Sequence, residues 1–138
     1  MRFFNHKANW DRVFKEYAEH VRAIRDSLPA GARALSSLSF HDSKVKSVKH
    51  LSKRAVEIVV EGRGYNFFTG EWLERGTYTF SFAGVKKAWV PYSIVGAYWI
   101  HEEIDLSEVA AFDYRVALTK HEIRVQADDV LFTQGVCV

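Results

Sequence analysis

The clearest pattern in the chain is a helical one near its N-terminus. From Trp10 onward, hydrophobic residues recur at the i, i+3, i+4, i+7 spacing that places them on one face of an α-helix. Asn9 is a suitable N-cap, and Pro29 followed by Gly31 supplies a stop signal. The pattern therefore predicts one amphipathic helix over residues 10–28.

After Ser39 the period of the pattern changes to two. Hydrophobic residues alternate with polar ones, which is typical of β-strands that have one buried and one solvated face. The alternating segments contain Val56, Ile58 and Val60; Tyr78, Phe80 and Phe82; and Phe112, Tyr114, Val116 and Leu118. Two further strands are predicted at about 44–51 and 97–104, and another at 130–133 or 136–138.

Short polar turns between successive strands predict how the strands are connected. Lys120 and His121 separate the strand that ends near 119 from Ile123 and Val125, which favours an antiparallel hairpin. We expect an α+β fold in a single domain over residues 1–138. Its N-terminal amphipathic helix is expected to pack on a curved antiparallel sheet, a meander of six or seven strands, with a half-barrel or a sandwich as alternatives.

One segment, GRGYNFFTGEWLERG at residues 62–76, places four large aromatic residues among four glycines. Glycines mark turns, whereas aromatic rings need burial or a partner. The segment is therefore either a contact loop or an irregular connection folded over an open edge of the core. The stretch 84–96, with Lys86 and Lys87, presents the same choice. The candidate interaction residues are Tyr65, Phe67, Phe68, Trp72, Lys86 and Lys87.

Charge and cysteine content narrow the classes of partner. The 138-residue chain has 19 basic and 17 acidic side chains, so its net charge is only +2. No strong field draws it to nucleic acid or to an anionic membrane, and neither is expected as a partner. No hydrophobic run is long enough to span a membrane. The single cysteine, Cys137, cannot form an internal disulfide, which favours a cytoplasmic location.

Catalytic signatures are missing from the sequence. It has no phosphate-binding glycine loop, no GxSxG, no CxxC and no GxGxxG. The segment HEEID at 101–105 begins like the zinc-protease motif HExxH, but Asp105 stands where the second histidine is needed. We therefore name no catalytic residue and predict no cofactor.

Two histidine and carboxylate segments could still form a metal or acid/base site. On a strand, alternate residues share a face: Tyr98, Ile100, Glu102 and Ile104 on one side, and Trp99, His101, Glu103 and Asp105 on the other. If the two segments pair as strands, their side chains could meet. The candidate ligands are then His41, Asp42, His101, Glu103 and Asp105.

The alternative for these segments is purely structural. Asp42 would tie the turn that enters the strand at 44 through a local backbone hydrogen bond. Glu102 would face hydrophobic neighbours and would need a hydrogen-bonding partner, such as an arginine or a backbone amide.

Three motifs together resemble a bacterial family of unknown function. They are LSFHDSKV at 38–45, WIHEEIDL at 99–106, and FDYRVALT at 112–119 followed by HEIRVQADDV at 121–130. The resemblance covers most of the chain and implies a small cytoplasmic protein of one domain. Some members of such families are similar to immunity proteins that neutralise a toxin domain.

We expect a non-enzymatic protein-interaction or regulatory module, with an immunity-like role and an unidentified protein partner. The first alternative is a small-ligand binding module, because a curved sheet closed by a helix can leave an aromatic-lined pocket. The second alternative is a metal-dependent enzyme that uses the histidine and carboxylate residues named above.

Overall fold

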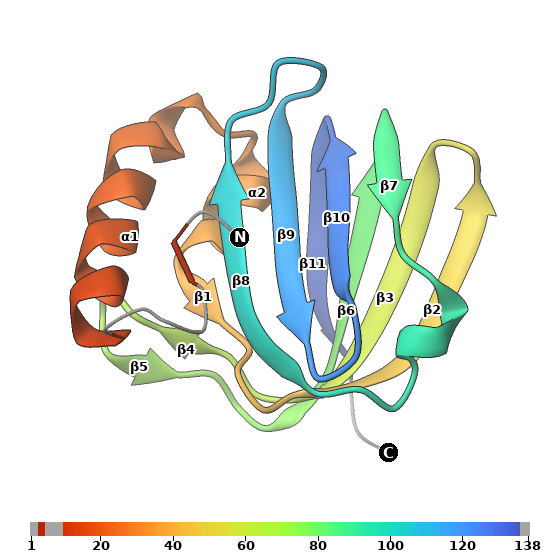
Figure 1. Ribbon diagram of the computed structural model, residues 1–138, viewed down its shortest axis with the longest axis horizontal. Helices are drawn as coiled ribbons and strands as arrows, with labels where there is room; N and C mark the ends of the chain where they lie inside the picture. The colour runs from red at the N-terminus through yellow and green to blue at the C-terminus, as the bar shows by residue number, and fades with distance from the viewer. Residues whose placement is uncertain (1–2, 5–9, 136–138) are drawn as a thin grey trace.

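The computed structural model describes residues 3–4 and 10–135. The predicted N-cap Asn9, the possible strand at 136–138 and Cys137 lie outside the described residues. Within these residues the fold is mixed α and β, with two α-helices and with antiparallel sheets that do not close into a barrel (Figure 1). No helix in the described ranges is both long enough and apolar enough to cross a membrane.

The predicted helix at 10–28 is shorter than expected and is followed by a second one. Helix α1 covers Trp10–Ile24, a 3-10 turn η1 covers Arg25–Ser27, and helix α2 covers Ala30–Ser36. The predicted stop before Pro29 is confirmed, because η1 ends at Ser27 and Leu28 is extended. Pro29 is also the N-cap residue of α2, a helix that the sequence did not predict.

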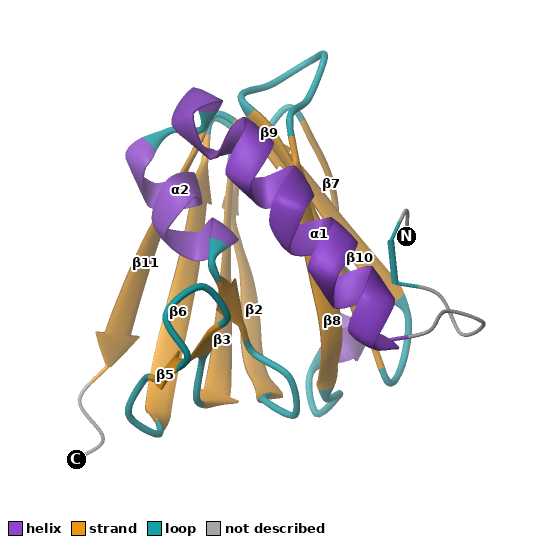
Figure 2. Ribbon diagram, turned by 90° about the vertical axis from the view of Figure 1, so that its left-hand side faces the viewer, coloured by secondary structure: helices purple, strands orange, loops and turns teal. Residues whose placement is uncertain are grey.

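Helix α2 lies beside the edge strand β11 (Asp129–Gly135), and α1 lies beside β8 (Trp99–Asp105) (Figures 1 and 2). Gly31 makes the close approach of α2 possible, because a Cβ atom there would lie 1.7 Å from the Val130 carbonyl oxygen. On α1, Val13, Tyr17 and Val21 are buried, and the Tyr17 hydroxyl accepts a hydrogen bond of 2.7 Å from the Ile104 amide.

The strands form two four-stranded sheets and a small third sheet. The first large sheet has the order β11-β6-β3-β2, with β6 at Gly76–Ala83, β3 at Ala55–Gly62 and β2 at Lys44–Ser52. The second has the order β7-β10-β9-β8, with β7 at Lys87–Trp89, β10 at Glu122–Ala127 and β9 at Phe112–Leu118. The small sheet contains β1 (Leu38–Ser39), β4 (Tyr65–Asn66) and β5 (Glu71–Trp72), and a 3-10 turn η2 covers Tyr92–Ile94.

The hairpin between β9 and β10 is confirmed, with the Leu118 amide bonded to the His121 carbonyl oxygen. The strand predicted at 130–133 corresponds to β11. The single meander is wrong, because β7 pairs with β10 and β11 pairs with β6, so eight of the strands divide between the two large sheets. Alternation along one strand does not reveal which distant strand it will pair with.

The hydrophobic core lies between the two large sheets, which form two layers in Figure 1. Aromatic rings meet across the layers: Phe80 packs on Trp99 with 5.5 Å between ring centroids, and Phe82 packs on Phe112 at 6.2 Å. The layers are also joined at one end, where the Val45 amide donates to the Ala97 carbonyl oxygen at 2.9 Å. This junction fixes the start of β2 against the start of β8.

Candidate functional site

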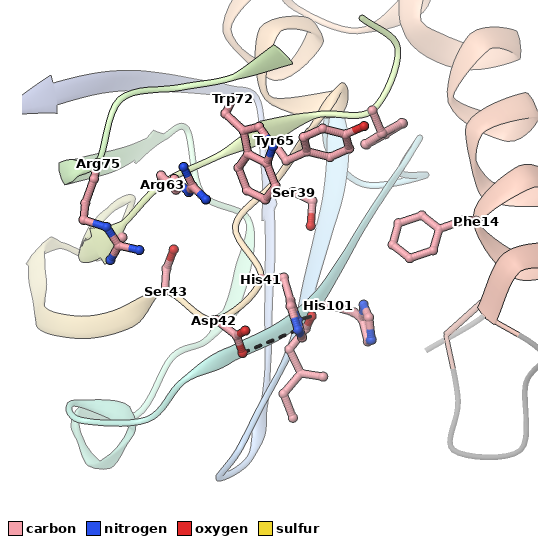
Figure 3. Close-up of a pocket in the computed structure, with 13 residues that line it drawn as sticks. Phe14, Ser39, His41, Asp42, Ser43, Arg63, Tyr65, Trp72, Arg75 and His101 are labelled. Atoms are coloured by element: carbon pink, nitrogen blue, oxygen red, sulfur yellow. Dashed lines mark hydrogen bonds and ion pairs between the residues drawn. The ribbon is translucent and has the colours of Figure 1, made fainter. Parts of the chain in front are cut away.

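A pocket of about 770 Å³ lies where the turn before β2, the start of β8 and the aromatic segment 62–76 meet (Figure 3). Helix α1 contributes Phe14 at one side of it. A pocket of this size can hold a small organic molecule. Its lining residues are Phe14, Ser39, His41, Asp42, Ser43, Gly62, Arg63, Tyr65, Phe67, Trp72, Arg75, Ile100 and His101.

The turn Phe40-His41-Asp42-Ser43 forms the floor of the pocket and is tied to β8 by the backbone. The Ser43 amide donates to the Phe40 carbonyl oxygen, and Asp42 has a φ of 67°. Aspartate tolerates this left-handed conformation better than most residues do. The Asp42 amide donates to the Trp99 carbonyl oxygen at 2.8 Å. The turn is therefore anchored by the main chain, and the Asp42 side chain is left exposed.

His41 is held in place through both ring nitrogens. Its Nδ1 donates to the Ile100 carbonyl oxygen at 2.8 Å, and its Nε2 lies 3.4 Å from Oδ1 of Asp42. Asp42 thus pairs with its neighbour His41, whereas the predicted structural role was a bond from its side chain to the turn backbone. The main chain of β8 therefore fixes one ring nitrogen of His41, and the other lies beside the Asp42 carboxylate.

His101 lies in a stack of three rings. Its ring is parallel to that of Phe4, with 4.7 Å between centroids, and lies 5.7 Å from the ring of His41. Burial, together with a smaller effect of the charge of His41, lowers the pKa of His101 from 6.5 to about 4. His101 is therefore neutral at physiological pH and lines the pocket without adding charge to it.

The predicted division of β8 into two faces is wrong at its start. A register shift between Trp99 and His101 places an extra residue in the strand, and such a bulge resets the alternation. Trp99 therefore points into the core together with Glu102 and Ile104, while Ile100 lines the pocket.

Glu102 and Glu103, which follow His101, point to opposite sides of β8 and have different hydrogen-bond partners. Glu102 is buried and accepts a hydrogen bond of 2.7 Å from the Phe40 amide, which is the backbone partner that the sequence required. The Ser39 hydroxyl also lies 3.5 Å from its carboxylate. Burial raises the pKa of Glu102 from 4.5 to about 7, against the lowering effect of these hydrogen bonds.

The five candidate ligands are only partly brought together. His41, Asp42 and His101 line the pocket, whereas Glu103 and Asp105 line a separate hollow of about 70 Å³. Glu103 accepts hydrogen bonds from the Phe3 and Phe4 amides, and Asp105 lies 3.2 Å from Nε2 of His20. Over residues 3–4 and 10–135, no three histidine, cysteine, aspartate or glutamate side chains gather to hold a metal ion. The metal site stays a prediction.

The aromatic segment divides between the pocket and the core. Tyr65 and Trp72 face each other across β4 and β5, with 4.7 Å between centroids, and both line the pocket. Phe67 also lines it, while Phe68 packs on Phe67 and lies beneath the guanidinium of Arg22 at 4.9 Å. The segment thus partly covers the core and partly lines the pocket, and its role in contacts with a partner stays a prediction.

Lys86 and Lys87 do not lie beside this aromatic segment. Lys87 is in β7, which lies away from β5 in both views of the molecule (Figures 1 and 2). Lys86 pairs with Asp128 at 3.5 Å. An interaction role for the two lysines stays a prediction, but it would concern a different surface from that of Tyr65 and Trp72.

Sequence reasoning missed Arg63, Arg75 and Ser43, which all line the pocket. The two arginines stand just outside the paired strands β3 and β6, whose last register pair is Gly62 with Gly76. The signal was present in the sequence, because an arginine next to glycine occurs at each end of the aromatic segment. No local pattern pointed to Ser43.

The chain belongs to the family described as a protein of unknown function, DUF4085, whose model matches residues 3–123. No curated protein matches the chain, and no solved structure matches it.

Proposed function

We propose that this chain, as a member of a family whose function is unknown, is a small-ligand binding protein whose ligand occupies the pocket of about 770 Å³. The observation that carries the proposal is that three segments far apart in sequence meet around one space. Aromatic and apolar groups supply most of its wall, and a few polar groups are fixed in orientation, as is usual for small-molecule sites.

Binding is favoured over catalysis by the way the polar groups are held. The Nδ1 of His41 is bonded to the Ile100 carbonyl oxygen, its Nε2 lies 3.4 Å from Oδ1 of Asp42, and the Ser39 hydroxyl is directed to the Glu102 carboxylate. Nucleophilic catalysis needs a hydroxyl or thiol within reach of a free base. The arrangement around His41 instead provides a rigid floor against which a ligand can pack.

The proposal is tested by thermal unfolding in the presence of a panel of small metabolites. A ligand at a hundred times its Kd stabilises a protein by about 2.7 kcal/mol, which raises the melting temperature of a domain of this size by about 5 °C or more. We expect hits to lose their effect in Trp72→Ala. Trp89→Ala is the matched control, because Trp89 is 54% exposed, Trp72 is 57% exposed, and Trp89 does not line the pocket. Hits that persist in Trp72→Ala, or disappear equally in both variants, would contradict the proposal.

A protein partner remains the second candidate, and one observation favours it. Exposed aromatic and aliphatic side chains recur along the segment 89–98, and none of them lines the pocket; they are Trp89, Tyr92, Val95 and Tyr98. Scattered surface hydrophobics are common, but a series of them can mark an interface. An immunity-like role in a reducing cytoplasm, which the single cysteine favours, belongs to this candidate.

The second candidate is tested by in-cell crosslinking followed by mass spectrometry. We expect a stoichiometric partner that is lost in the double variant Trp89→Ala/Tyr92→Ala and retained in Trp72→Ala. Retention of the partner in the double variant would exclude the segment 89–98 as its contact surface.

A further inference from the structure

The pocket has a positively charged end that no carboxylate neutralises. Arg63 and Arg75 both line it, and neither has an ion-pair partner among the residues that the structure describes. Asp42, the one acidic residue of the pocket wall, lies beside His41 at 3.4 Å and forms no ion pair with either arginine, so two positive charges face a single carboxylate. The space next to the arginines therefore carries an excess of positive charge.

The two arginines are side by side because of the strand register. Strands β3 and β6 end their ladder at the pair Gly62 and Gly76, so the adjoining residues Arg63 and Arg75 leave the sheet at the same place. Like charges at neighbouring cross-strand positions destabilise a sheet. A negatively charged group between the two guanidinium groups would remove this repulsion.

A third polar group faces the same space. The Ser43 side chain is fully buried, and its hydroxyl has no hydrogen-bond partner. Figure 3 shows this hydroxyl and both guanidinium groups turned toward the same part of the pocket. A buried hydroxyl without a hydrogen-bond partner lowers the stability of the folded protein. A hydrogen bond from a ligand atom to this hydroxyl would remove that cost.

The glycine at position 62 is part of this arrangement. A Cβ atom there would lie 2.2 Å from the Ser43 hydroxyl oxygen, so any other residue would displace the serine. Gly62 thus leaves the Ser43 side chain room at the positive end of the pocket.

The other walls of the pocket are flat and aromatic. The Arg63 guanidinium lies over the Trp72 ring at 4.1 Å, so this arginine is held in one orientation. Tyr65 packs against Trp72, and Phe14 lies at the far side of the pocket from Arg75 (Figure 3). The positive end and the aromatic walls therefore belong to one space.

From this arrangement we infer that the ligand of the proposed pocket is a small organic anion, in which a carboxylate or phosphate group is joined to a flat aromatic body. Arg63, Arg75 and Ser43 bind the anionic oxygens, since guanidinium groups match the geometry of carboxylate and phosphate. Tyr65 and Trp72 pack against the aromatic body. The inference rests on the proposed function and adds the chemical class of the ligand.

The test uses three probes and the indole N–H signals of Trp72 and Trp89 in ¹⁵N-labelled protein at pH 7. The probes are 2-naphthoate, its neutral analogue 2-naphthamide, and inorganic phosphate. We expect 2-naphthoate to shift the Trp72 signal in a saturable way without moving the Trp89 signal. Its Kd should be about tenfold lower than that of 2-naphthamide, because a charge-assisted bidentate bond is lost in the amide. Phosphate alone should bind more weakly than 2-naphthoate.

Variants that remove one positive charge distinguish the effect of the two pocket arginines on ligand affinity from the effect of the net charge of the protein. Arg75→Gln should raise the Kd of 2-naphthoate about tenfold and leave that of 2-naphthamide within about threefold. Arg63→Gln should do the same, and Arg63→Lys should restore part of the affinity. Arg54→Gln is the matched control, because it removes the same charge from the exposed turn between β2 and β3.

The outcomes distinguish this inference from the proposed function. If 2-naphthamide binds as tightly as 2-naphthoate and Arg75→Gln changes neither Kd, the anionic class is wrong while the pocket still binds small molecules. If Arg54→Gln weakens the binding of 2-naphthoate as much as Arg75→Gln does, the preference for the anionic probe arises from the net charge of the protein, and the inference is again wrong. If no probe moves the Trp72 signal, both the ligand class and the proposed function fail.

Discussion

Glu102 and Glu103 are neighbours in β8 and are equally buried, with 5% of each residue exposed, yet they fasten two different parts of the molecule. Glu102 faces the core and holds the turn that forms the pocket floor, through the Phe40 amide. Glu103 faces the opposite side of the strand and holds the N-terminal segment, through the amides of Phe3 and Phe4 at 3.0 Å each.

The extent of burial therefore does not define the role of a carboxylate. Glu102 lies among hydrophobic residues, so desolvation raises its pKa to about 7. Glu103 lies in a small hollow that Asp113 and Arg115 also line. Both glutamates support the pocket indirectly, because Phe4 stacks on His101 and Phe40 precedes His41.

The largest expected effect is on the pH dependence of stability in Glu102→Gln. Between pH 4.5 and 7 the folded state keeps the Glu102 proton while the unfolded state has lost it, so the free energy of unfolding falls as pH rises. The difference between the two pKa values corresponds to about 3 kcal/mol. Glutamine cannot ionise, yet it can still accept the Phe40 hydrogen bond. Urea unfolding should show Glu102→Gln to be near wild type at pH 5 and about 3 kcal/mol more stable at pH 8.

The control for this prediction is Glu57→Gln, which removes one negative charge from β3 without touching Glu102. If the free energies of unfolding of wild type and Glu102→Gln differ by the same amount at pH 5 and at pH 8, Glu102 does not keep its proton in the folded state.

A smaller effect is expected for Glu103→Ala. The variant removes the acceptor of the Phe3 and Phe4 amides, which water can reach once the segment loosens, so stability should fall by about 1 kcal/mol. Hydrogen exchange of these two amides should accelerate by about tenfold. Because Phe4 then leaves His101, the pKa of His101 should rise from about 4 toward its ordinary value, as followed by NMR titration.

Glu108→Ala is the matched control, because Glu108 lies in the loop between β8 and β9. Unchanged exchange at Phe3 and Phe4 in Glu103→Ala would mean that the carboxylate does not hold the N-terminal segment.

The smallest effect is expected for His101→Phe, which keeps a flat ring between Phe4 and His41 but cannot take up a proton. In wild type the unfolded state gains the His101 proton before the folded state does as pH falls from 6.5 to 4, so this residue makes stability rise with pH. That trend opposes the one from Glu102 over much of the same range.

Stability measured by urea unfolding should therefore be less acid-sensitive in His101→Phe than in wild type. The change should be smaller than that in Glu102→Gln, because His101 is only partly buried and solvent screens its charge. An acid sensitivity equal to that of wild type would show that His101 does not contribute to it.

Local patterns predicted the strands that have one buried face, since alternation depends only on neighbouring residues. The segments around Ile58, Phe80 and Val116 became β3, β6 and β9. Secondary structure and side-chain direction were predicted wrongly where contacts between distant segments outweighed the local sequence pattern. Helix α2, which packs on β11, was not predicted, and Trp99 turns inward because a bulge resets the strand.

The candidate site was predicted only in separate parts. The sequence singled out His41 and His101 on one hand and Tyr65 and Trp72 on the other, but nothing local indicated that they share a pocket. The arginines were overlooked because a charged residue beside glycine in a loop is ordinary on any protein surface.

By itself the sequence determined the kinds of element in this protein and the need of Glu102 for a buried partner, because periodicity and desolvation act on a residue and its near neighbours. Only the tertiary structure decided that the strands form two large sheets and a small third one, that the partner is the Phe40 amide, and that Arg63 and Arg75 emerge together beside Ser43. Strand pairing is a choice among distant segments, and it is made by the packing of the whole core.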